Sequence, residues 1–226
     1  MMSILHSIRT NISKPHKAGY PFLCISALIS FIGYRIHARI GHLIGLIGSL
    51  FLGFCWYFFR NPKRIVPHKN DILVSPADGT VSAINYIPPP VDLGLDDKPV
   101  WRISIFLSIF NVHLQRIPVA GKITARSYIK GKFFNASLDK ASEHNERNAI
   151  CITLPDGKKV VVVQIAGLIA RRIVCNADIN QQFNMGDIYG LIRFGSRVDL
   201  YLPDGCQPCV EVGQTMIGGE TIVAKL

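Results

Sequence analysis

A glycine–serine pair near the C-terminus, Gly195-Ser196, could do chemistry on the chain itself. Glycine leaves the backbone carbonyl before the serine unshielded and tolerates strained dihedral angles. The serine hydroxyl can attack that carbonyl, which gives an N-to-O acyl shift and an ester. Elimination from the ester would cut the chain and leave residue 196 as an N-terminal pyruvoyl group. The alternative is a plain turn between two apolar, strand-like runs, 188–192 and 198–202.

An imidazole and a carboxylate that could activate this serine lie elsewhere in the sequence. Five of the seven histidines precede residue 70, which leaves His113 and His144 for the rest of the chain. His113 follows an apolar strand-like run, whereas His144 lies in a strongly polar stretch and is expected to be solvated. Asp78 begins an Asp-Gly pair, which on its own is typical of a turn. Together these types predict that Asp78 orients His113 and that His113 deprotonates Ser196.

The positive charge of the chain is concentrated at its N-terminus. The formal net charge is +10, and the first 70 residues contain nine Lys and Arg but no Asp or Glu. The remaining sixteen basic residues are balanced by all fifteen acidic ones. A basic and apolar N-terminus favours an anionic membrane surface, where each Lys or Arg contributes about 1 kcal/mol. No basic run interleaved with aromatic residues follows, so nucleic acid is not an expected partner.

Two uncharged apolar runs, 20–34 and 40–59, predict a helical hairpin in a membrane. The positive-inside tendency places both the N-terminus and residues 60–226 on the cytoplasmic face of the cell (inner) membrane. Arg35 and Arg39 lie at the turn of the hairpin and favour shallow or peripheral insertion, although two full spans stay open. We therefore divide the chain into a basic, apolar anchor, 1–62, and a second domain, 63–226.

The second domain has the pattern of a mainly β (α+β) fold. Short apolar runs recur between turn signals such as Asp-Gly, and only 136–147 and 167–174 look helical. The C-terminal segment 212–221 resembles a lipoyl/biotinyl-type half-barrel, but no lysine lies at the hairpin tip where a carrier domain needs one. Cys206 and Cys209 have CxxC spacing without a second pair, so neither a zinc site nor another metal site is predicted.

The motifs as an ordered set resemble the short, bacterial form of phosphatidylserine decarboxylase. The resemblance covers 50–226 and rests on Phe58-Phe59-Arg60-Asn61-Pro62, Ser75-Pro76-Ala77-Asp78-Gly79, Phe110-Asn111-Val112-His113, Asn145-Glu146-Arg147-Asn148, the run 164–172 and Arg193-Phe194-Gly195-Ser196. Longer members have a further histidine three residues before the triad histidine, where this chain has Phe110. They also have Leu-Gly-Ser-Thr where this chain has Phe194-Gly195-Ser196-Arg197, with the glycine and the serine intact.

The resemblance implies a pyruvoyl-dependent lyase that converts phosphatidylserine in the membrane to phosphatidylethanolamine through a Schiff base. Its precursor would cut itself between Gly195 and Ser196 into a β chain, 1–195, and an α chain, 196–226. The Asp–His–Ser triad of the family falls on Asp78, His113 and Ser196. The pyruvoyl group acts as an electron sink, as pyridoxal phosphate does elsewhere, and His113 is the candidate for the proton return.

The phosphate of such a lipid needs a cationic partner. Guanidinium groups suit bidentate binding of phosphate, and the candidates in the sequence are Arg147, Arg171, Arg172 and Arg197. Because homo-oligomers are common, the expected assembly is a homodimer.

Two other functions fit parts of the sequence. A membrane-tethered β-barrel module that only binds would need neither cleavage nor Ser196. A serine hydrolase would use the same three side chains, but the GxSxG elbow lacks its second glycine, since Val198 stands there.

Overall fold

The computed structural model describes residues 13–69, 71–131, 145–167, 172–193 and 195–226. The chain divides into two compact units, Met1–Lys63 and Arg64–Leu226, and each is described by itself. The sequence placed this boundary between residues 62 and 63.

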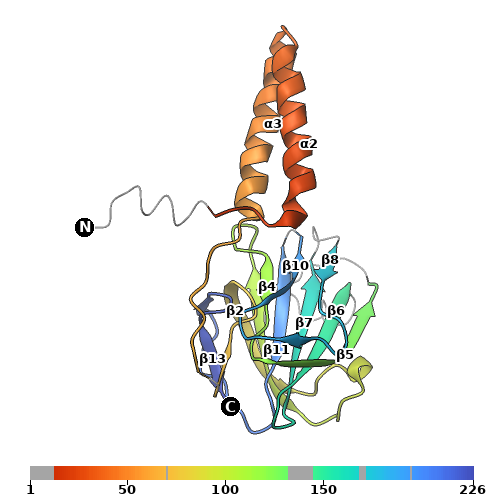
Figure 1. Ribbon diagram of the computed structural model, residues 1–226, viewed down its shortest axis with the longest axis vertical. Coiled ribbons are helices and arrows are strands. Elements are labelled where there is room, and N and C mark those ends of the chain that lie inside the picture. Colours follow the sequence, from red (N-terminus) through yellow and green to blue (C-terminus); the bar gives the residue numbers. More distant parts are fainter. Residues whose placement is uncertain (1–12, 70, 132–144, 168–171, 194) are drawn as a thin grey trace, which may run out of the picture. The chain divides into compact units, whose positions relative to one another are not determined.

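The first unit is a helical hairpin, as expected. A short 3-10 turn, η1 (Lys17–Gly19), leads into α2 (Tyr20–Arg35), and α3 (Arg39–Phe58) returns alongside it (Figure 1). Small residues let the helices approach closely: a Cβ added at Gly48 would lie 2.8 Å from the backbone nitrogen of Ser30. Ser30 also donates a hydrogen bond across the hairpin to the carbonyl of Gly45, at 3.1 Å. Large apolar side chains therefore face outward, among them Phe31, Ile40 and Leu50.

The second unit consists of antiparallel strands, which confirms the mainly β expectation. The eight-stranded sheet has the order β12-β2-β3-β11-β7-β6-β5-β9, a three-stranded sheet has the order β4-β10-β8, and β1 pairs with β13 (Figure 1). The bounds are β1 Ile72–Val74, β2 Gly79–Ile87, β3 Val100–Leu107, β4 Leu114–Arg116, β5 Gly121–Ile129, β6 Arg147–Thr153, β7 Lys159–Ala166, β8 Ile173–Cys175, β9 Gln182–Phe183, β10 Ile188–Ile192, β11 Ser196–Tyr201, β12 Thr215–Met216 and β13 Ile222–Lys225, with a 3-10 turn η2 at Val91–Leu93.

The eight-stranded sheet buries both of its faces. Because side chains alternate along a strand, the central strands β6, β7 and β11 each supply buried residues to two separate apolar clusters. We call inner the face that carries Ile105, Val162 and Val198, which packs with Tyr189 and Ile192 of the three-stranded sheet. We call outer the face that carries Ala149, Cys151, Val161, Val163, Ile165 and Tyr201 and packs with Leu93 of η2. The inner face is therefore the one enclosed between the two sheets.

Three details differ from the sequence-based expectation. Of the run 136–147, only 145–147 lie within the described residues, and Arg147 begins strand β6 rather than ending a helix. Of the run 167–174, residues 168–171 lie outside the described part, and Ile173 and Val174 belong to strand β8. Residues 210–212, one of the short apolar runs that the sequence pattern predicts to be strands, form no strand. Local propensity misled in each place because pairing with a distant strand, or its absence, decided the conformation.

Candidate active site

Ser196 is the first residue of β11 and lies in the interior of the sheet. It pairs with Leu107 of β3 on one side and with Ala166 of β7 on the other. The residue is fully buried, and its hydroxyl has no hydrogen-bond partner among the described residues. Gly195 before it has a φ of 70°, a left-handed conformation that disfavours residues with a side chain. An unsatisfied buried hydroxyl is uncommon in proteins and calls for a chemical explanation.

His113 lies beside the segment that leads to Ser196. It directly precedes β4, where Leu114 pairs with Leu191 of β10, so the next position in this register is opposite Ile192. From Ile192 the chain continues through 193–195 to Ser196, and from Leu107, the partner of Ser196, it continues through 108–112 to His113. Strands β4 and β10 pair in one sheet, and β3 and β11 pair in the other. One short connection links β10 to β11 and another links β3 to β4. His113 and Ser196 therefore lie at the same end of the two sheets.

The tautomer of His113 follows from its hydrogen bond. Nδ1 lies 2.9 Å from the carbonyl oxygen of Asn111, and because a carbonyl can only accept, Nδ1 carries the proton. The lone pair of the neutral ring is then on Nε2, which is the arrangement that a general base requires.

Asp78 has other partners than the sequence predicts. Its Oδ2 lies 2.7 Å from Arg64 Nη2, and its Oδ1 accepts a hydrogen bond of 2.8 Å from the backbone nitrogen of Gly218. The structure thus does not pair Asp78 with His113, whose ring is oriented by a backbone carbonyl instead. The turn that holds Asp78 nevertheless packs on β4, since Arg116 N donates to Pro76 O at 2.8 Å.

The candidate phosphate-binding arginines fall on different faces of the sheet. Arg197 is buried on the outer face in an ion pair with Asp199, with Nε–Oδ1 and Nη2–Oδ2 distances of 2.9 and 3.0 Å. Arg147 is on the same outer face, 3.5 Å from Asp92. Arg172 lies next to the segment that precedes Ser196, because its carbonyl accepts a hydrogen bond from Arg193 N at 3.2 Å. Arg171 lies outside the described residues.

A chain of polar side chains that the sequence analysis missed crosses the inner face. Arg126 donates to Asn148, Asn148 to Gln164 and Gln164 to Gln115, at 3.2, 3.0 and 3.0 Å. Gln115 in turn donates to the carbonyl of His113, at 3.0 Å. Since β5, β6, β7 and β4 each contribute one member, no local sequence signal marks this chain.

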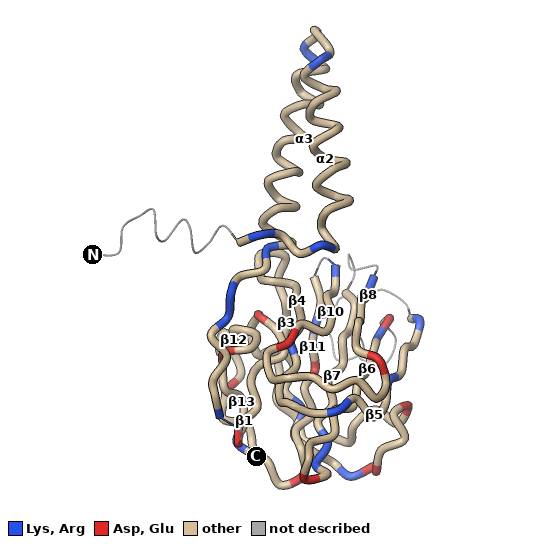
Figure 2. Tube along the Cα trace, in the orientation of Figure 1, with Lys and Arg blue, Asp and Glu red and all other residues tan. Residues whose placement is uncertain are grey.

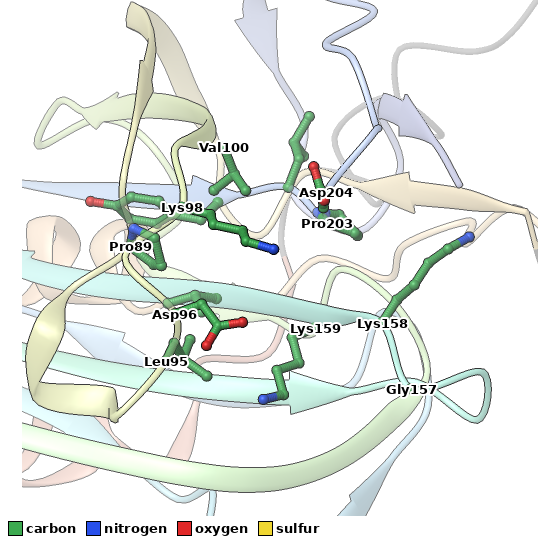
Figure 3. A pocket seen from close by; sticks show the side chains of 13 residues that line it. Pro89, Leu95, Asp96, Lys98, Val100, Gly157, Lys158, Lys159, Pro203 and Asp204 are labelled. Carbon is green, nitrogen blue, oxygen red and sulfur yellow. The ribbon is translucent and has the colours of Figure 1, made fainter.

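Two of the cavities formed by described residues of the second unit lie towards opposite ends of β11. One, of about 370 Å³, is lined by Lys98, Lys159 and Asp96 around an apolar floor (Figure 3). Tyr201 also lines it, five residues beyond Ser196, so it lies about 17 Å from the serine. It is therefore too distant to share a small substrate with Ser196.

The other cavity, of about 410 Å³, opens on the inner face near the Ser196 end of the sheet. The described residues that line it are Arg126, Tyr128, Glu146, Asn148, Arg172, Ile173 and Cys175. We call it the arginine pocket. Its polar wall is continuous with the chain of side chains that ends at His113.

The charges and the length of the helical hairpin bear on its association with a membrane. Lys and Arg lie at both ends of the helical hairpin, and its described residues include no Asp or Glu (Figure 2). Both helices, Lys17–Arg35 with its 3-10 turn and Arg39–Phe58, are long and apolar enough to cross a membrane, which indicates membrane association.

All six cysteines are free, and burial raises the pKa of the Cys206 thiol. Within the described parts of the chain, no three His, Cys, Asp or Glu side chains form a group that could hold a metal ion.

Known proteins match this sequence over nearly its whole length. The family described as phosphatidylserine decarboxylase matches residues 51–224. A phosphatidylserine decarboxylase proenzyme of Gluconobacter oxydans (strain 621H) is 50% identical over 225 residues, which cover 100% of both chains. A protein of the same name from Rickettsia typhi (strain ATCC VR-144 / Wilmington) is 52% identical over 209 residues, which cover 92% of this chain and 89% of the relative. Together with a buried serine behind a left-handed glycine and a histidine at the same end of the sheets, these matches show that the chain belongs to the phosphatidylserine decarboxylase family.

Proposed function

We propose that this protein converts phosphatidylserine to phosphatidylethanolamine with a pyruvoyl group made from its own Ser196. The observation that carries the proposal is the hydroxyl of Ser196, buried in the middle of a sheet without a hydrogen-bond partner among the described residues. Most buried hydroxyls have a hydrogen-bond partner. Buried Ser104 also lacks one among the described residues, but Ser196 alone of the two directly follows a glycine in the left-handed conformation, with a φ of 70°. The residues fit the group, because a short ketone at position 196 would need no more room than the serine.

Formation of the group requires only Ser196, Gly195, a base and water. Ser196 Oγ attacks the carbonyl carbon of Gly195, the peptide C–N bond breaks, and the freed nitrogen takes the proton that Oγ loses. Removal of the Cα proton of residue 196 then expels the ester oxygen as the C-terminal carboxylate of Gly195. The remaining dehydroalanine tautomerises to an imine, and water replaces its nitrogen, which leaves as ammonia. No oxidant or metal is needed.

His113 is the base that supports these proton transfers. Its Nδ1–H is held by the carbonyl of Asn111, so that Nε2 carries the lone pair, and it lies at the end of the sheets where residue 196 is presented. When formed, the pyruvoyl group supplies the electron sink that lets a carboxylate leave as CO₂. The same imidazole, protonated, then returns a proton to the α-carbon of the substrate.

Asp78 has an indirect part in this proposal. It is bound to Arg64 and to the amide of Gly218, and it thereby fixes the turn that packs on β4 beside His113. Asp78 is therefore proposed as a positioning residue, whereas the sequence predicts that it is the direct partner of the imidazole.

The hairpin would hold the enzyme at the leaflet that contains its substrate. Helices α2 and α3, at 1.5 Å per residue, are about 24 and 30 Å long, and their large apolar side chains face outward. Cationic residues at both ends of the hairpin favour anionic lipid, and the positive-inside tendency places the second unit on the cytoplasmic face of the inner membrane. The α and β chains of one precursor would stay together, and a homodimer is the expected assembly.

The competing function is a membrane-tethered module that binds without catalysis, and intact mass of the purified protein separates the two. We expect wild-type protein to yield chains 1–195 and 196–226, the second lighter than its serine form by the mass of the one ammonia molecule that is released. Ser196→Ala should remain a single uncut chain without activity. Ser104→Ala is a matched control. Ser104 is buried on the neighbouring strand and its hydroxyl also lacks a partner among the described residues, but its side chain lies on the outer face of the sheet, whereas that of Ser196 lies on the inner face. A single intact and active wild-type chain would overturn the proposal.

A further inference from the structure

The arginine pocket and Ser196 share one face and one end of the eight-stranded sheet. Ser196 pairs with Ala166, and Ala166 N donates to the carbonyl of Glu146, at 2.9 Å. The three residues therefore form a row across β11, β7 and the start of β6. With strands about 4.8 Å apart, the backbone of Glu146 lies about 10 Å from that of Ser196. The residue between them contributes only a methyl group.

The pocket contains two guanidinium groups whose positive charge is not neutralised by a close ion pair with a described carboxylate. Arg126 is held in place by Asn148 and by the carbonyl of Ala177, at 3.2 and 3.1 Å, and its contact with the exposed Asp178, at 3.5 Å, is weak. Arg172 forms no ion pair with any of the described carboxylates. Its charge lowers the pKa of Arg193, in addition to the effect of burial, which agrees with a cationic site beside the scissile segment.

The carboxylate of Glu146 does not cancel this charge. Among the described residues that line the pocket it is the one acidic group, and two arginines oppose it. Its Oε1 accepts from the backbone nitrogen of Ile173 at 3.4 Å, and its hydrogen bond with Tyr128 raises the pKa of that phenol, after the larger effect of burial. The pocket thus keeps a net positive charge and prepositioned donors.

We infer that Arg126 and Arg172 bind the phosphodiester of the substrate headgroup in this pocket. The inference rests on the proposed function and adds the residues that hold the substrate. The phosphate is assigned rather than the carboxylate because an ion pair with the carboxylate would stabilise the ground state and oppose the loss of CO₂. With its phosphate in the arginine pocket, the headgroup extends along the inner face, past Ala166, and presents its amine to residue 196.

Cys175 offers a direct probe of occupancy, since this half-buried thiol lines the pocket. In full-length, cleaved protein with the exposed thiols removed by Cys24→Ser and Cys209→Ser, the rate of Cys175 alkylation would be followed by mass spectrometry. We expect sn-glycero-3-phosphoserine and sn-glycero-3-phosphoethanolamine both to slow alkylation, because both carry the phosphodiester. Free serine should not. Protection by serine but not by glycerophosphoethanolamine would overturn the assignment of the phosphate.

Substitution of the arginines gives the second test. Arg126→Gln and Arg172→Gln should each be cut normally but raise KM for phosphatidylserine about 10- to 150-fold, the loss expected for one charge-assisted hydrogen bond. Lys122→Gln, which removes an exposed charge from the same strand as Arg126, should leave KM unchanged.

The outcomes separate this inference from the proposed function. Cleaved variants with a wild-type KM and unchanged protection of Cys175 would refute the headgroup pocket and leave the pyruvoyl chemistry intact. A wild-type chain that is never cut would refute the proposed function instead. If Arg126→Gln alone stays uncut, two measurements still test the headgroup pocket: the KM of Arg172→Gln and the protection of Cys175 from alkylation in the wild-type pocket.

Discussion

The buried ion pair directly after Ser196 makes a sharp prediction about stability. Arg197 and Asp199 are both almost completely buried on the outer face, and they make two contacts of 2.9 and 3.0 Å. Arg102 lies farther away, with Nη1 3.9 Å from Asp199 Oδ2. Replacement of Arg197 by an apolar residue of similar length would therefore leave a buried carboxylate with one distant partner. Removal of one member of such a pair costs about 3–5 kcal/mol.

The expected effect is large enough for calorimetry. For a protein of this size each kcal/mol lowers the melting temperature by about 2–4 °C, so Arg197→Met should melt about 6–20 °C lower. The measurement should use a Ser196→Ala background, so that all variants have the same uncut chain, and one scan rate, because unfolding need not be reversible.

A second variant shows whether the isolated charge is the cause. Arg197→Met combined with Asp199→Asn leaves no unpaired carboxylate, and Arg102 keeps its hydrogen bond to Asn85 at 3.0 Å. We expect this double variant to recover much of the lost melting temperature. If the double variant melts as low as Arg197→Met, the loss comes from packing and the electrostatic reasoning is wrong.

Two further predictions concern the base and the hairpin. His113→Ala should slow self-cleavage by about 10²- to 10⁴-fold, the usual contribution of a general base, in a time course on denaturing gels, whereas exposed His68→Ala should cut normally. Equal rates for the two variants would remove His113 from the mechanism. Gly48→Ala should loosen the packing of α2 on α3, because its Cβ would lie 2.8 Å from Ser30 N, and backbone hydrogen exchange in detergent should rise there. Gly53→Ala is the control on the same helix, with no atom within 4 Å of its Cβ, and equal exchange in both variants would contradict the close packing.

The sequence predicted the parts of this protein that depend on residue type and local pattern. Two uncharged runs gave the helices α2 and α3 almost to the residue. Period-two alternation and turn signals gave the mainly β fold. The same alternation predicts one further feature. Ser196 and Arg197 are consecutive in a strand, so their side chains point to opposite faces of the sheet.

What could not be predicted depends on which strands become neighbours. Arg126, Asn148 and Gln164 come together because β5, β6 and β7 pair in one register, and a shift by one residue would turn each side chain to the other face. The partner of Asp78 is Arg64, which the sequence analysis counted only as part of the basic N-terminus. Both results follow from tertiary pairing, which composition and spacing do not encode.

If the chain is cut before Ser196, as we propose, the central position of β11 limits when the cut can occur. From Ser196 to Tyr201 this strand is paired with β3 on one side and with β7 on the other. While the chain is intact, its insertion between these neighbours is an intramolecular event. After a cut before residue 196 the same insertion would require two separate molecules to meet, and its probability would depend on their concentration. In the proposed reaction, folding would have to come first and cleavage second, and a cleaved molecule that unfolds would lack the covalent link that guided its assembly. Each copy of such an enzyme would have a single opportunity to fold.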